Sequence, residues 1–501
     1  MPTKALRITA AALFCALLLP ALAACGAETG NKPAVTQANA VTEAATAEET
    51  TTGILMPDLP DMNFGGETFT ILDSSENDTN GADWVTYDVY SEGENGDAIN
   101  DAVFARNLWL SETYNVVIAE KKSSSTTLAD TQKAVLAGDD IYDAVMTNIS
   151  ASATLAQNGQ TWDMYQIPYI ELTNPWWDQN AIATLSIAGH MNYATGDITV
   201  IDNDATWVLM FNKQLAENLN LDSFYDRVNN DQWHYDYFEK LTIDASLDLN
   251  GDGVMKCYDD QYGMVTTNMT AVGIFYSSGL MIAGKDENDL PVLALDTNLA
   301  ATVVERTAEW FTNKDVVCYN GGPSMYQSPA ETREAFQNGQ GLFYGEVMQC
   351  IIRMRQSETD FGLIPWPKYT EKQDRYYNFT VASATKMITV PLTQTDLEMT
   401  GIVLEAMAAK SRYTLTPAYY DISMNNKYMR DEESIAMMEI ILKSLCFDLG
   451  YVYDWGSLYT KLYNKLYKNS GENFSSIYAA CETAFNTAMQ QTIETYQAAG
   501  K

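Results

Sequence analysis

The feature that most constrains the fold is a regular alternation of short apolar strands and amphipathic helices in the first third of the chain. Strands are predicted at 66–75, 116–122 and 142–148, and helices at 97–115 and 127–138. The first strand alternates apolar and polar side chains, and the first helix places Ile99 and Val103 on one face. Because strands separated by helices of this length pair in parallel, the pattern predicts an α/β fold built from βαβ units.

The alternation returns in the second half of the chain. Apolar strands followed or preceded by helical patterns are predicted at 206–221, 336–347, 359–368 and 387–411. From Arg430 to the end the pattern is helical throughout, and no repeat of fixed period is visible. A chain of 501 residues is long enough for about two to three domains, so more than one sheet is expected.

The N-terminal residues carry targeting signals rather than fold. Lys4 and Arg7 precede an apolar run that is too short and too rich in alanine for a membrane span, so residues 1–24 are predicted to be a signal peptide. The run ends in LAAC, which resembles the bacterial lipobox, so Cys25 is expected to carry a lipid. An ordinary secretory signal is the alternative. Residues 25–60, poor in aromatic side chains, are predicted to form a disordered tether.

The charge of the chain limits its partners. Asp and Glu number 66 and Lys and Arg 30, which gives a net charge of −36. A field of that sign repels nucleic acid and anionic lipid and favours a neutral or cationic solute. After the signal, no further run of 18 or more apolar residues occurs, so contact with the membrane is expected through the lipid only.

The sequence offers no catalytic motif. Only His190 and His234 are present, neither lies beside a nucleophile motif, and no phosphate-binding glycine loop is evident. We therefore expect no enzyme and no catalytic residue, although a glycosidase that uses two carboxylates stays open. Five scattered cysteines remain beyond Cys25; they predict neither a zinc site nor a disulfide framework and leave one disulfide open.

The stretch LDLNGDGVMKCYDD, residues 247–260, matches a twelve-residue calcium loop. The predicted ligands are Asp248, Asn250, Asp252, the Val254 carbonyl and Asp259. Gly253 occupies the position of the sharp turn, whereas Lys256 cannot bind calcium. A polar turn without an ion is the alternative. Because the loop is single, we expect structural calcium rather than a sensor.

Several segments together resemble a known family. The strand and helix in WVLMFNKQL, and the order of AFQNGQGLFYGEV before FGLIPWPK, follow the lipobox and the tether. In this order they are similar to the family 1 extracellular solute-binding proteins of ABC importers, which include maltose- and oligosaccharide-binding proteins. The resemblance covers residues 66–500. It implies a two-lobed periplasmic-binding-protein type II fold, in which each lobe is a mixed sheet flanked by helices and crossing hinge strands join the lobes.

The resemblance also implies where the lobes and the ligand lie. The first lobe would hold residues 66–200 and 380–430, and the second would hold 205–370 and 431–500, with the calcium-type loop 248–259. Ligand contacts are expected at strand ends and on aromatic side chains that face the cleft. The candidates are Ser74, Ser75, Asn148, Ser150, Trp176, Trp177, Asp197, Tyr344, Glu346, Tyr377 and Asn378. Core packing is the alternative for each aromatic, and turns or caps for the polar residues.

The resemblance predicts a substrate-binding lipoprotein of an ABC importer, held by its lipid at the extracellular face of the membrane. It would capture a neutral solute, a mono- or oligosaccharide, by closure of the two lobes and deliver it to the permease subunits. A monomer is expected, with no nucleic-acid partner. The alternatives are a receptor for oligopeptides or cationic solutes, and a surface glycan hydrolase or glycan adhesin.

Overall fold

The computed structural model of the chain describes residues 54–79, 84–321, 325–354, 357–424, 432–469 and 471–499. The predicted signal peptide, the lipidation site at Cys25 and the tether up to residue 53 lie outside the described residues. Residues 54–60, the last part of the predicted tether, run along the body of the protein without regular secondary structure. Met56 and Leu59 pack half-buried against the core, and the Leu55 N–H donates to the Tyr413 hydroxyl at 3.0 Å.

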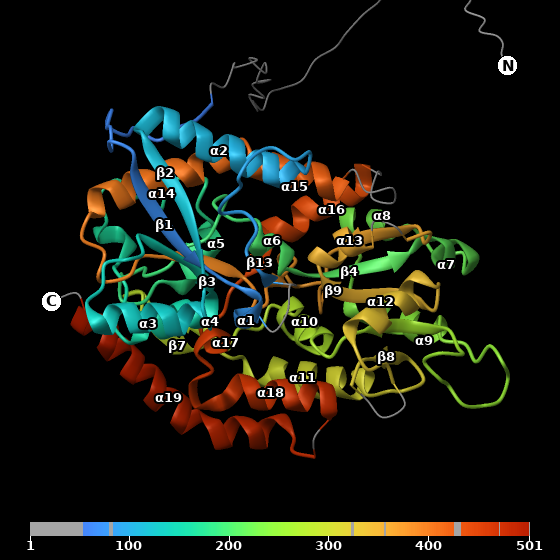
Figure 1. The fold of residues 1–501 in the computed structure, drawn as a ribbon. Helices are drawn as coiled ribbons and strands as arrows, with labels where there is room; N and C mark the ends of the chain where they lie inside the picture. The colour runs from blue at the N-terminus through green and yellow to red at the C-terminus, as the bar shows by residue number, and fades with distance from the viewer. Residues whose placement is uncertain are drawn as a thin grey trace, which may run out of the picture. The chain divides into compact units, whose positions relative to one another are not determined.

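The first sheet has four strands in the order β12–β3–β1–β2 (Figure 1). Their bounds are Glu67–Asp73 for β1, Val116–Lys122 for β2, Ala144–Asn148 for β3 and Lys386–Thr389 for β12. The first three pair in parallel, as the βαβ pattern predicts, whereas β12 returns antiparallel to β3. The sheet is therefore mixed, and its last strand comes from more than 230 residues further along the chain.

Helices cover both faces of the first sheet. They are α2 (Ala98–Tyr114), α3 (Thr127–Ala137), α4 (Ile149–Gln157), α14 (Leu397–Ser411) and α15 (Leu415–Met424). The connection from β1 to β2 and the connection from β2 to β3 run in opposite directions across the sheet. Because such crossovers are right-handed, α2 and α3 lie on opposite faces (Figure 1). Helices α14 and α15 pack beside α2.

The second sheet has five strands in the order β10–β4–β9–β5–β8. They are β4 (Trp207–Asn212), β5 (Tyr262–Thr266), β8 (Val317–Tyr319), β9 (Gly341–Val347) and β10 (Phe361–Ile364). Strands β5, β8 and β9 are parallel, and β4 is antiparallel to both β9 and β10. Both sheets are thus mixed and flanked by helices, which confirms the predicted α/β class.

The helices of the second sheet are α7 to α13. Their bounds are Lys213–Asn218, Phe224–Asn229, Tyr235–Asp244, Thr270–Ser277, Thr297–Phe311, Pro329–Gln337 and Gln349–Arg353. Strand β9 is buried along its whole length. A Cβ atom at Gly345 would lie 2.6 Å from Thr270 Oγ1 and 2.9 Å from the Trp366 ring. Only glycine therefore lets α10 and Trp366 approach β9 this closely.

The chain passes between the two sheets where short segments pair with one another. Thr206, just after α6 (Ile201–Asp204), forms an antiparallel bridge with Thr380, and the Val381 N–H donates to the Ala205 carbonyl at 3.1 Å. Strand β11 (Asn378–Phe379) pairs in parallel with β13 (Leu445–Cys446). These crossings match the hinge strands that the sequence predicted.

The remaining helices are α1 (Glu76–Thr79), α5 (Gln179–Leu185), α16 (Glu432–Lys443), α17 (Leu449–Tyr453), α18 (Leu458–Lys468) and α19 (Phe474–Ala499). A short hairpin joins β6 (Ala283–Lys285) to β7 (Pro291–Leu293). Helix α19 contacts α4 beside the first sheet and α11 beside the second, so the C-terminal helices touch both parts. In the described part of the chain, no helix is both long and apolar enough to cross a bilayer.

Candidate binding site

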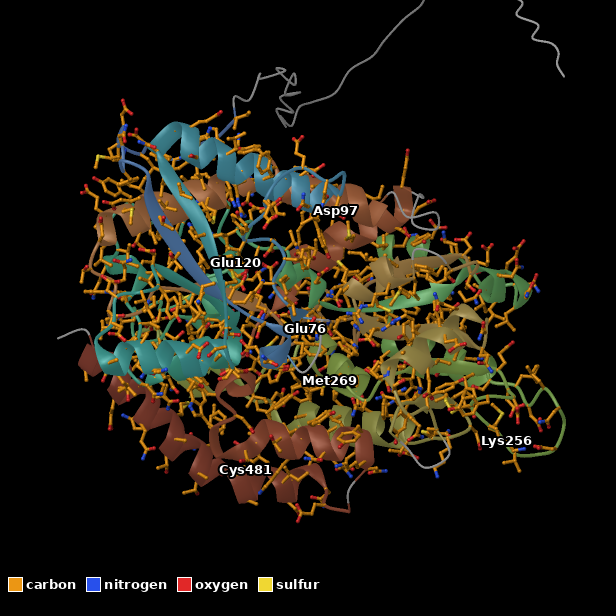
Figure 2. The ribbon with its side chains drawn as sticks, in the orientation of Figure 1. Glu76, Asp97, Glu120, Lys256, Met269 and Cys481 are labelled. Atoms are coloured by element: carbon orange, nitrogen blue, oxygen red, sulfur yellow. A yellow bond between two sulfur atoms is a disulfide. The ribbon has the colours of Figure 1, made fainter. Side chains whose placement is uncertain are left out.

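A pocket of about 240 Å³ lies where the second sheet faces the loop that follows β1. Its volume is just below the range of about 300–1,000 Å³ that is usual for ligand pockets. One wall carries Trp84, from the loop after β1, and the other carries the ends of β4, β5 and β9. The lining comprises Trp84, Trp207, Thr267, Asn268, Met269, Asn320, Pro329, Arg333, Glu346, Val347, Gln349, Cys350, Arg353 and Val381. Met269 marks this region near the centre of Figure 2.

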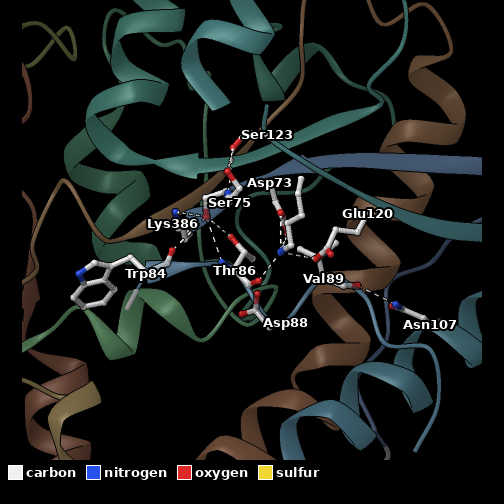
Figure 3. Close-up of polar contacts among 12 residues, drawn as sticks. Asp73, Ser75, Trp84, Thr86, Asp88, Val89, Asn107, Glu120, Ser123 and Lys386 are labelled. Carbon is white, nitrogen blue, oxygen red and sulfur yellow. Dashed lines mark hydrogen bonds and ion pairs between the residues drawn. The ribbon is translucent and has the colours of Figure 1, made fainter. Parts of the chain in front are cut away.

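A buried polar network holds the loop that carries Trp84. Ser74 Oγ lies 3.3 Å from the Trp84 carbonyl oxygen and 2.9 Å from Thr86 Oγ1, and the Thr86 N–H donates to it at 3.3 Å. Lys386 Nζ, from β12, donates to the same Ser74 oxygen at 2.8 Å. Figure 3 shows these contacts gathered at the end of β1, with the Trp84 ring directed away from them. The first sheet thus fixes the backbone of Trp84 and leaves its ring for the pocket.

Burial shifts the pKa values of two groups in this network. Lys386 is only 2% exposed, and burial lowers its pKa to about 8. Asp73 is fully buried; burial and the neighbouring Glu120 raise its pKa, and Lys122 opposes them. Lys122 Nζ lies 2.9 Å from Asp73 Oδ1 and 3.0 Å from Glu120 Oε1, and it also donates to the Thr86 carbonyl at 2.7 Å. The ammonium group therefore ties β2 to the loop as well.

The opposite wall is built around Glu346 on β9. Strand pairing places Glu346 beside Val208 of β4, next to Trp207. Glu346 is 7% exposed, and its Oε1 accepts the Val347 N–H at 3.0 Å. Burial raises the pKa of Glu346, and the Arg333 and Arg353 charges oppose that shift. The carboxyl is thus a hydrogen-bonding group held at the rim of the pocket by its own strand.

Two arginines from short helices complete this wall. Arg333, on α12, is partly buried and donates from Nε to Cys350 Sγ at 3.1 Å. Arg353, on α13, donates to Gln349 Oε1 at 2.6 Å. Close by, the buried Oδ1 of Asn320 accepts no hydrogen bond among the described residues. Aromatic rings, guanidinium groups, a carboxyl and amides therefore converge on one cavity, which is the lining expected of a polar-solute site.

Of the predicted ligand contacts, only Glu346 lines this pocket. Ser74 and Ser75 support it from behind: Ser75 Oγ lies 3.1 Å from Ser123 Oγ. Asn148 caps α4 by accepting the Ala151 N–H at 2.9 Å, and Ser150 lies in the first turn of the same helix. Their side chains are thus placed by the backbone of the first sheet, in the role of turns and caps.

The two tryptophans predicted to stack on sugar lie in the core instead. Trp176 and Trp177 are each 1% exposed, and their indole N–H groups donate to the Glu405 carboxylate at 3.0 and 2.9 Å. Asp197 pairs with Arg412 at 3.0 Å and accepts the Thr416 hydroxyl at 2.6 Å. These three side chains do not reach the pocket for one reason. Each is hydrogen-bonded or paired with a polar residue of α14 or of the segment that follows it.

The last three predicted contacts lie around the second sheet and the crossings. Tyr344 and Asn378 are fully buried, and Asn378 donates to Ser444 Oγ at 2.6 Å. Tyr377 lines a separate cavity of about 430 Å³ between α5, the β6–β7 hairpin and β13. There the Arg375 guanidinium lies 4.5 Å from the centre of the Tyr377 ring. Lys285, which also lines this cavity, already bonds Ser186 and Asp289, so fewer free polar groups converge there.

The calcium-type loop lies far from the pocket: Lys256 marks it at the edge of the molecule in Figure 2, well away from Met269. Asp248 accepts the Gly251 and Gly253 N–H groups at 2.7 Å, and Gly253 has a φ of 77°, as a sharp turn requires. The side chains of Asn250 and Asp252 accept the N–H groups two residues ahead, and Asp252 also pairs with Lys256.

The carboxylate that closes this loop is Asp260, one residue beyond the predicted Asp259. Asp260 is fully buried and accepts the Leu249 and Lys256 N–H groups at 3.0 and 2.7 Å, whereas Asp259 is exposed. Among the described residues, no three His, Cys, Asp or Glu side chains are grouped where they could hold a metal ion. Calcium at this loop stays a prediction.

A disulfide anchors the end of the loop. Cys257 pairs with Cys318 of β8, with Cα atoms 5.8 Å apart. Spacing alone left this pairing open, because the two cysteines are 61 residues apart and only the second sheet brings them together. Cys350, Cys446 and Cys481 are buried free thiols.

Sequence reasoning missed the two residues that define the pocket. Trp84 lies in a stretch without a clear strand or helix pattern, where Tyr87 and Tyr90 follow it, so no local signal marked it as a pocket residue. Arg333 looked like an ordinary polar position of α12, a helix whose apolar face holds Ala335 and Phe336. No local pattern separates such an arginine from a solvated one.

Comparisons with known proteins agree with this architecture. No protein-family model matches the chain, and no curated protein is similar to it in sequence. Among solved structures, a family 1 extracellular solute-binding protein from Bifidobacterium longum subsp. infantis matches with a TM-score of 0.54 and 11% identity, over 84% of this chain and 100% of that one. An ABC substrate-binding protein from Listeria monocytogenes in complex with cycloalternan gives a TM-score of 0.53 at 11% identity, over 84% and 99%.

A cyclo/maltodextrin-binding protein complexed with maltotetraose is similar as well, with a TM-score of 0.51 and 11% identity, over 86% of this chain and 96% of that one. At these identities the likeness concerns the fold alone. It confirms the predicted architecture: the chain has the two-sheet fold of the extracellular solute-binding proteins.

Proposed function

We propose that this chain is the substrate-binding lipoprotein of an ABC importer and captures a sugar, a mono- or oligosaccharide, in the pocket beneath Trp84. The observation that carries the proposal is the origin of the two walls. Trp84 belongs to the loop that follows β1 of the first sheet, and Glu346 belongs to β9 of the second sheet. A solute bound there touches both parts of the protein, so its binding energy can hold them together.

The chemistry of the lining supports a sugar. Trp84 offers a flat apolar surface for the CH face of a ring, and amides, arginines and Glu346 offer donors and acceptors for hydroxyl groups. The paired crossings at Thr206 and Thr380 and at β11 and β13 provide the short connections about which two such parts can close. The solved structures of similar fold include proteins in complex with cycloalternan and maltotetraose.

The partners follow from the same proposal. Cys25 would carry the lipid at the extracellular face of the membrane, residues 25–53 would act as the tether, and the closed protein would dock as a monomer on the permease subunits. Mass spectrometry of the protein from the membrane fraction tests whether Cys25 carries a lipid. The Cys25→Ala variant is expected to be released from the membrane.

The test of ligand class is isothermal titration and thermal unfolding against matched panels of mono- and oligosaccharides, peptides and polyamines. We expect one group of sugars to bind and to raise the melting temperature, with the sugar recovered unchanged by chromatography. Binding of peptides or polyamines alone would favour the cationic-solute alternative. Release of shorter products from any glycan would contradict a receptor and favour the hydrolase.

A further inference from the structure

The pocket carries a charge opposite to that of the chain. Its described lining holds two arginines, Arg333 and Arg353, and a single carboxyl, Glu346. The whole chain has a net charge of −36. In a chain with 66 acidic and only 30 basic residues, a site at which cations outnumber carboxylates is unexpected unless its ligand calls for it.

Arg333 has donors to spare. Its Nε donates to Cys350 Sγ at 3.1 Å, and no ion pair joins its guanidinium to a carboxylate in the described part of the chain. Other arginines of the chain are paired: Arg227 with Asp222, Arg306 with Asp236 and Glu239, and Arg412 with Asp197. The terminal N–H groups of Arg333 are thus available to a ligand in the pocket that this residue lines.

Glu346 and Arg333 form no ion pair among the described residues, and Glu346 Oε1 is engaged by the Val347 N–H at 3.0 Å. Burial raises the pKa of Glu346, and the nearby Arg333 and Arg353 charges oppose that rise. The nearby thiol of Cys350 is uncharged, because burial raises its pKa to about 12.

We propose that the sugar taken by this pocket carries one negative group, a carboxylate or a sulfate monoester, and that Arg333 binds it through its terminal N–H groups. This inference rests on the proposed function, because it names the class of sugar. A guanidinium group matches two oxygens of a planar or tetrahedral oxyanion at once. The field of the whole chain, which repels anions at long range, makes one such charge more suitable than a polyanion.

The experiment compares pairs of probes that differ only in charge. Galacturonate and its methyl ester, glucuronate and its methyl ester, and galactose 6-sulfate with galactose are titrated into the wild-type protein. We expect at least one acidic probe to bind about tenfold or more tightly than its neutral partner, since hydrogen bonds to a charged group are worth that much. The uronate and sulfate pairs distinguish the two sources of the charge.

Variants locate the effect. Arg333→Gln is expected to bind the preferred acid and its neutral partner equally, and Arg333→Lys, which keeps the charge but not the two-pronged donor, should recover only part of the preference. Arg227→Gln removes a partly buried arginine that is paired with Asp222 outside the pocket, and it is the matched control. Circular dichroism and the melting temperature verify that each variant is folded, and the comparison of acid and neutral partner in the wild type needs no variant.

The outcomes separate the two levels of the hypothesis. If neutral sugars bind as tightly as their acidic partners, the acidic class is overturned and the sugar receptor stands. If the acidic probe is preferred but Arg333→Gln keeps the preference, Arg333 is not its partner and the inference fails. If no sugar of either charge binds, the proposed function fails, and this inference fails with it.

Discussion

Lys386 Nζ donates a hydrogen bond to Ser74 Oγ at 2.8 Å, although 312 residues separate the two in the chain. Both groups are buried, where β12 begins and β1 ends. The same Ser74 oxygen contacts the backbone of Trp84 and Thr86, so a strand from the last third of the chain helps to position the aromatic wall of the pocket.

Ser74→Ala should therefore weaken both the fold and the site. The buried ammonium of Lys386 and the Thr86 N–H would each lose an acceptor, and the expected cost is about 1–3 kcal/mol in the free energy of unfolding, measured by urea denaturation. Ser75→Ala is the matched control, because the Ser75 hydroxyl contacts Ser123, which follows β2, and not the loop that carries Trp84. Equal losses for the two variants would show that the Lys386 contact does not hold the loop.

Trp84→Ala should lower the affinity for the ligand about tenfold, since the half-buried ring lines the pocket. Titration calorimetry measures the affinity. Trp109→Ala, on α2, removes a half-buried tryptophan that contacts Lys410 and not the pocket, so it should leave the affinity unchanged. A reversed pattern would place the ligand elsewhere.

Removal of the disulfide in the Cys257→Ser/Cys318→Ser double variant should lower the free energy of unfolding by about 2–4 kcal/mol, because the bond closes a loop across 61 residues. A reducing agent should lower the melting temperature of the wild type to about that of the double variant. The melting temperature of the double variant should not respond to the reducing agent. A wild-type protein indifferent to reductant would contradict this pairing.

We propose that calcium binds the loop 248–259 and that it stabilises the protein without touching the ligand. Chelation should then lower the melting temperature and leave sugar affinity nearly unchanged, because the loop lies far from the pocket (Figure 2). Asp248→Asn should abolish the response to chelator. If the chelator removes sugar binding and leaves the melting temperature intact, the structural role is wrong.

Stability should rise as the pH falls from 7 to 5, partly through Asp204. This carboxyl is fully buried and accepts the Tyr87 and Tyr419 hydroxyls at 2.7 and 2.9 Å, and burial raises its pKa to about 6. Below pH 6 the folded state keeps a proton that the unfolded chain, with a pKa near 3.8, has released, so stability is lost as the pH rises through 6.

Asp204 contributes about 1 kcal/mol to this change. Asp204→Asn should therefore flatten the dependence of the melting temperature on pH between 5 and 7, whereas Asp139→Asn, at an exposed position, should keep the wild-type slope. Other buried carboxyls such as Asp202, whose pKa burial also raises, act in the same direction, so the informative quantity is the difference between the two variants. Identical slopes would show that Asp204 does not titrate in this range.

Local patterns determined the elements of this protein. Apolar alternation places β1 at Glu67–Asp73, close to the predicted 66–75, and helical spacing places α2 at Ala98–Tyr114. The βαβ order determined that the first three strands are parallel, because crossovers of that length allow no other pairing. Glycine at position 253 determined the sharp turn of the calcium-type loop through its positive φ. The strand, helix and turn assignments depend on residues that are close to one another in the sequence.

The tertiary structure alone decided which side chains form the site. Trp176 and Trp177 suited sugar stacking by residue type, but Glu405, more than 225 residues away, turns both indoles into the core. Trp84 has no helical or strand pattern of its own, and Lys386 and Ser74 position its backbone. Arg333 and Glu346 meet Trp84 only because the crossings bring the two sheets together. Burial and hydrogen-bond partners are set by segments distant in sequence, and no local spacing encodes them.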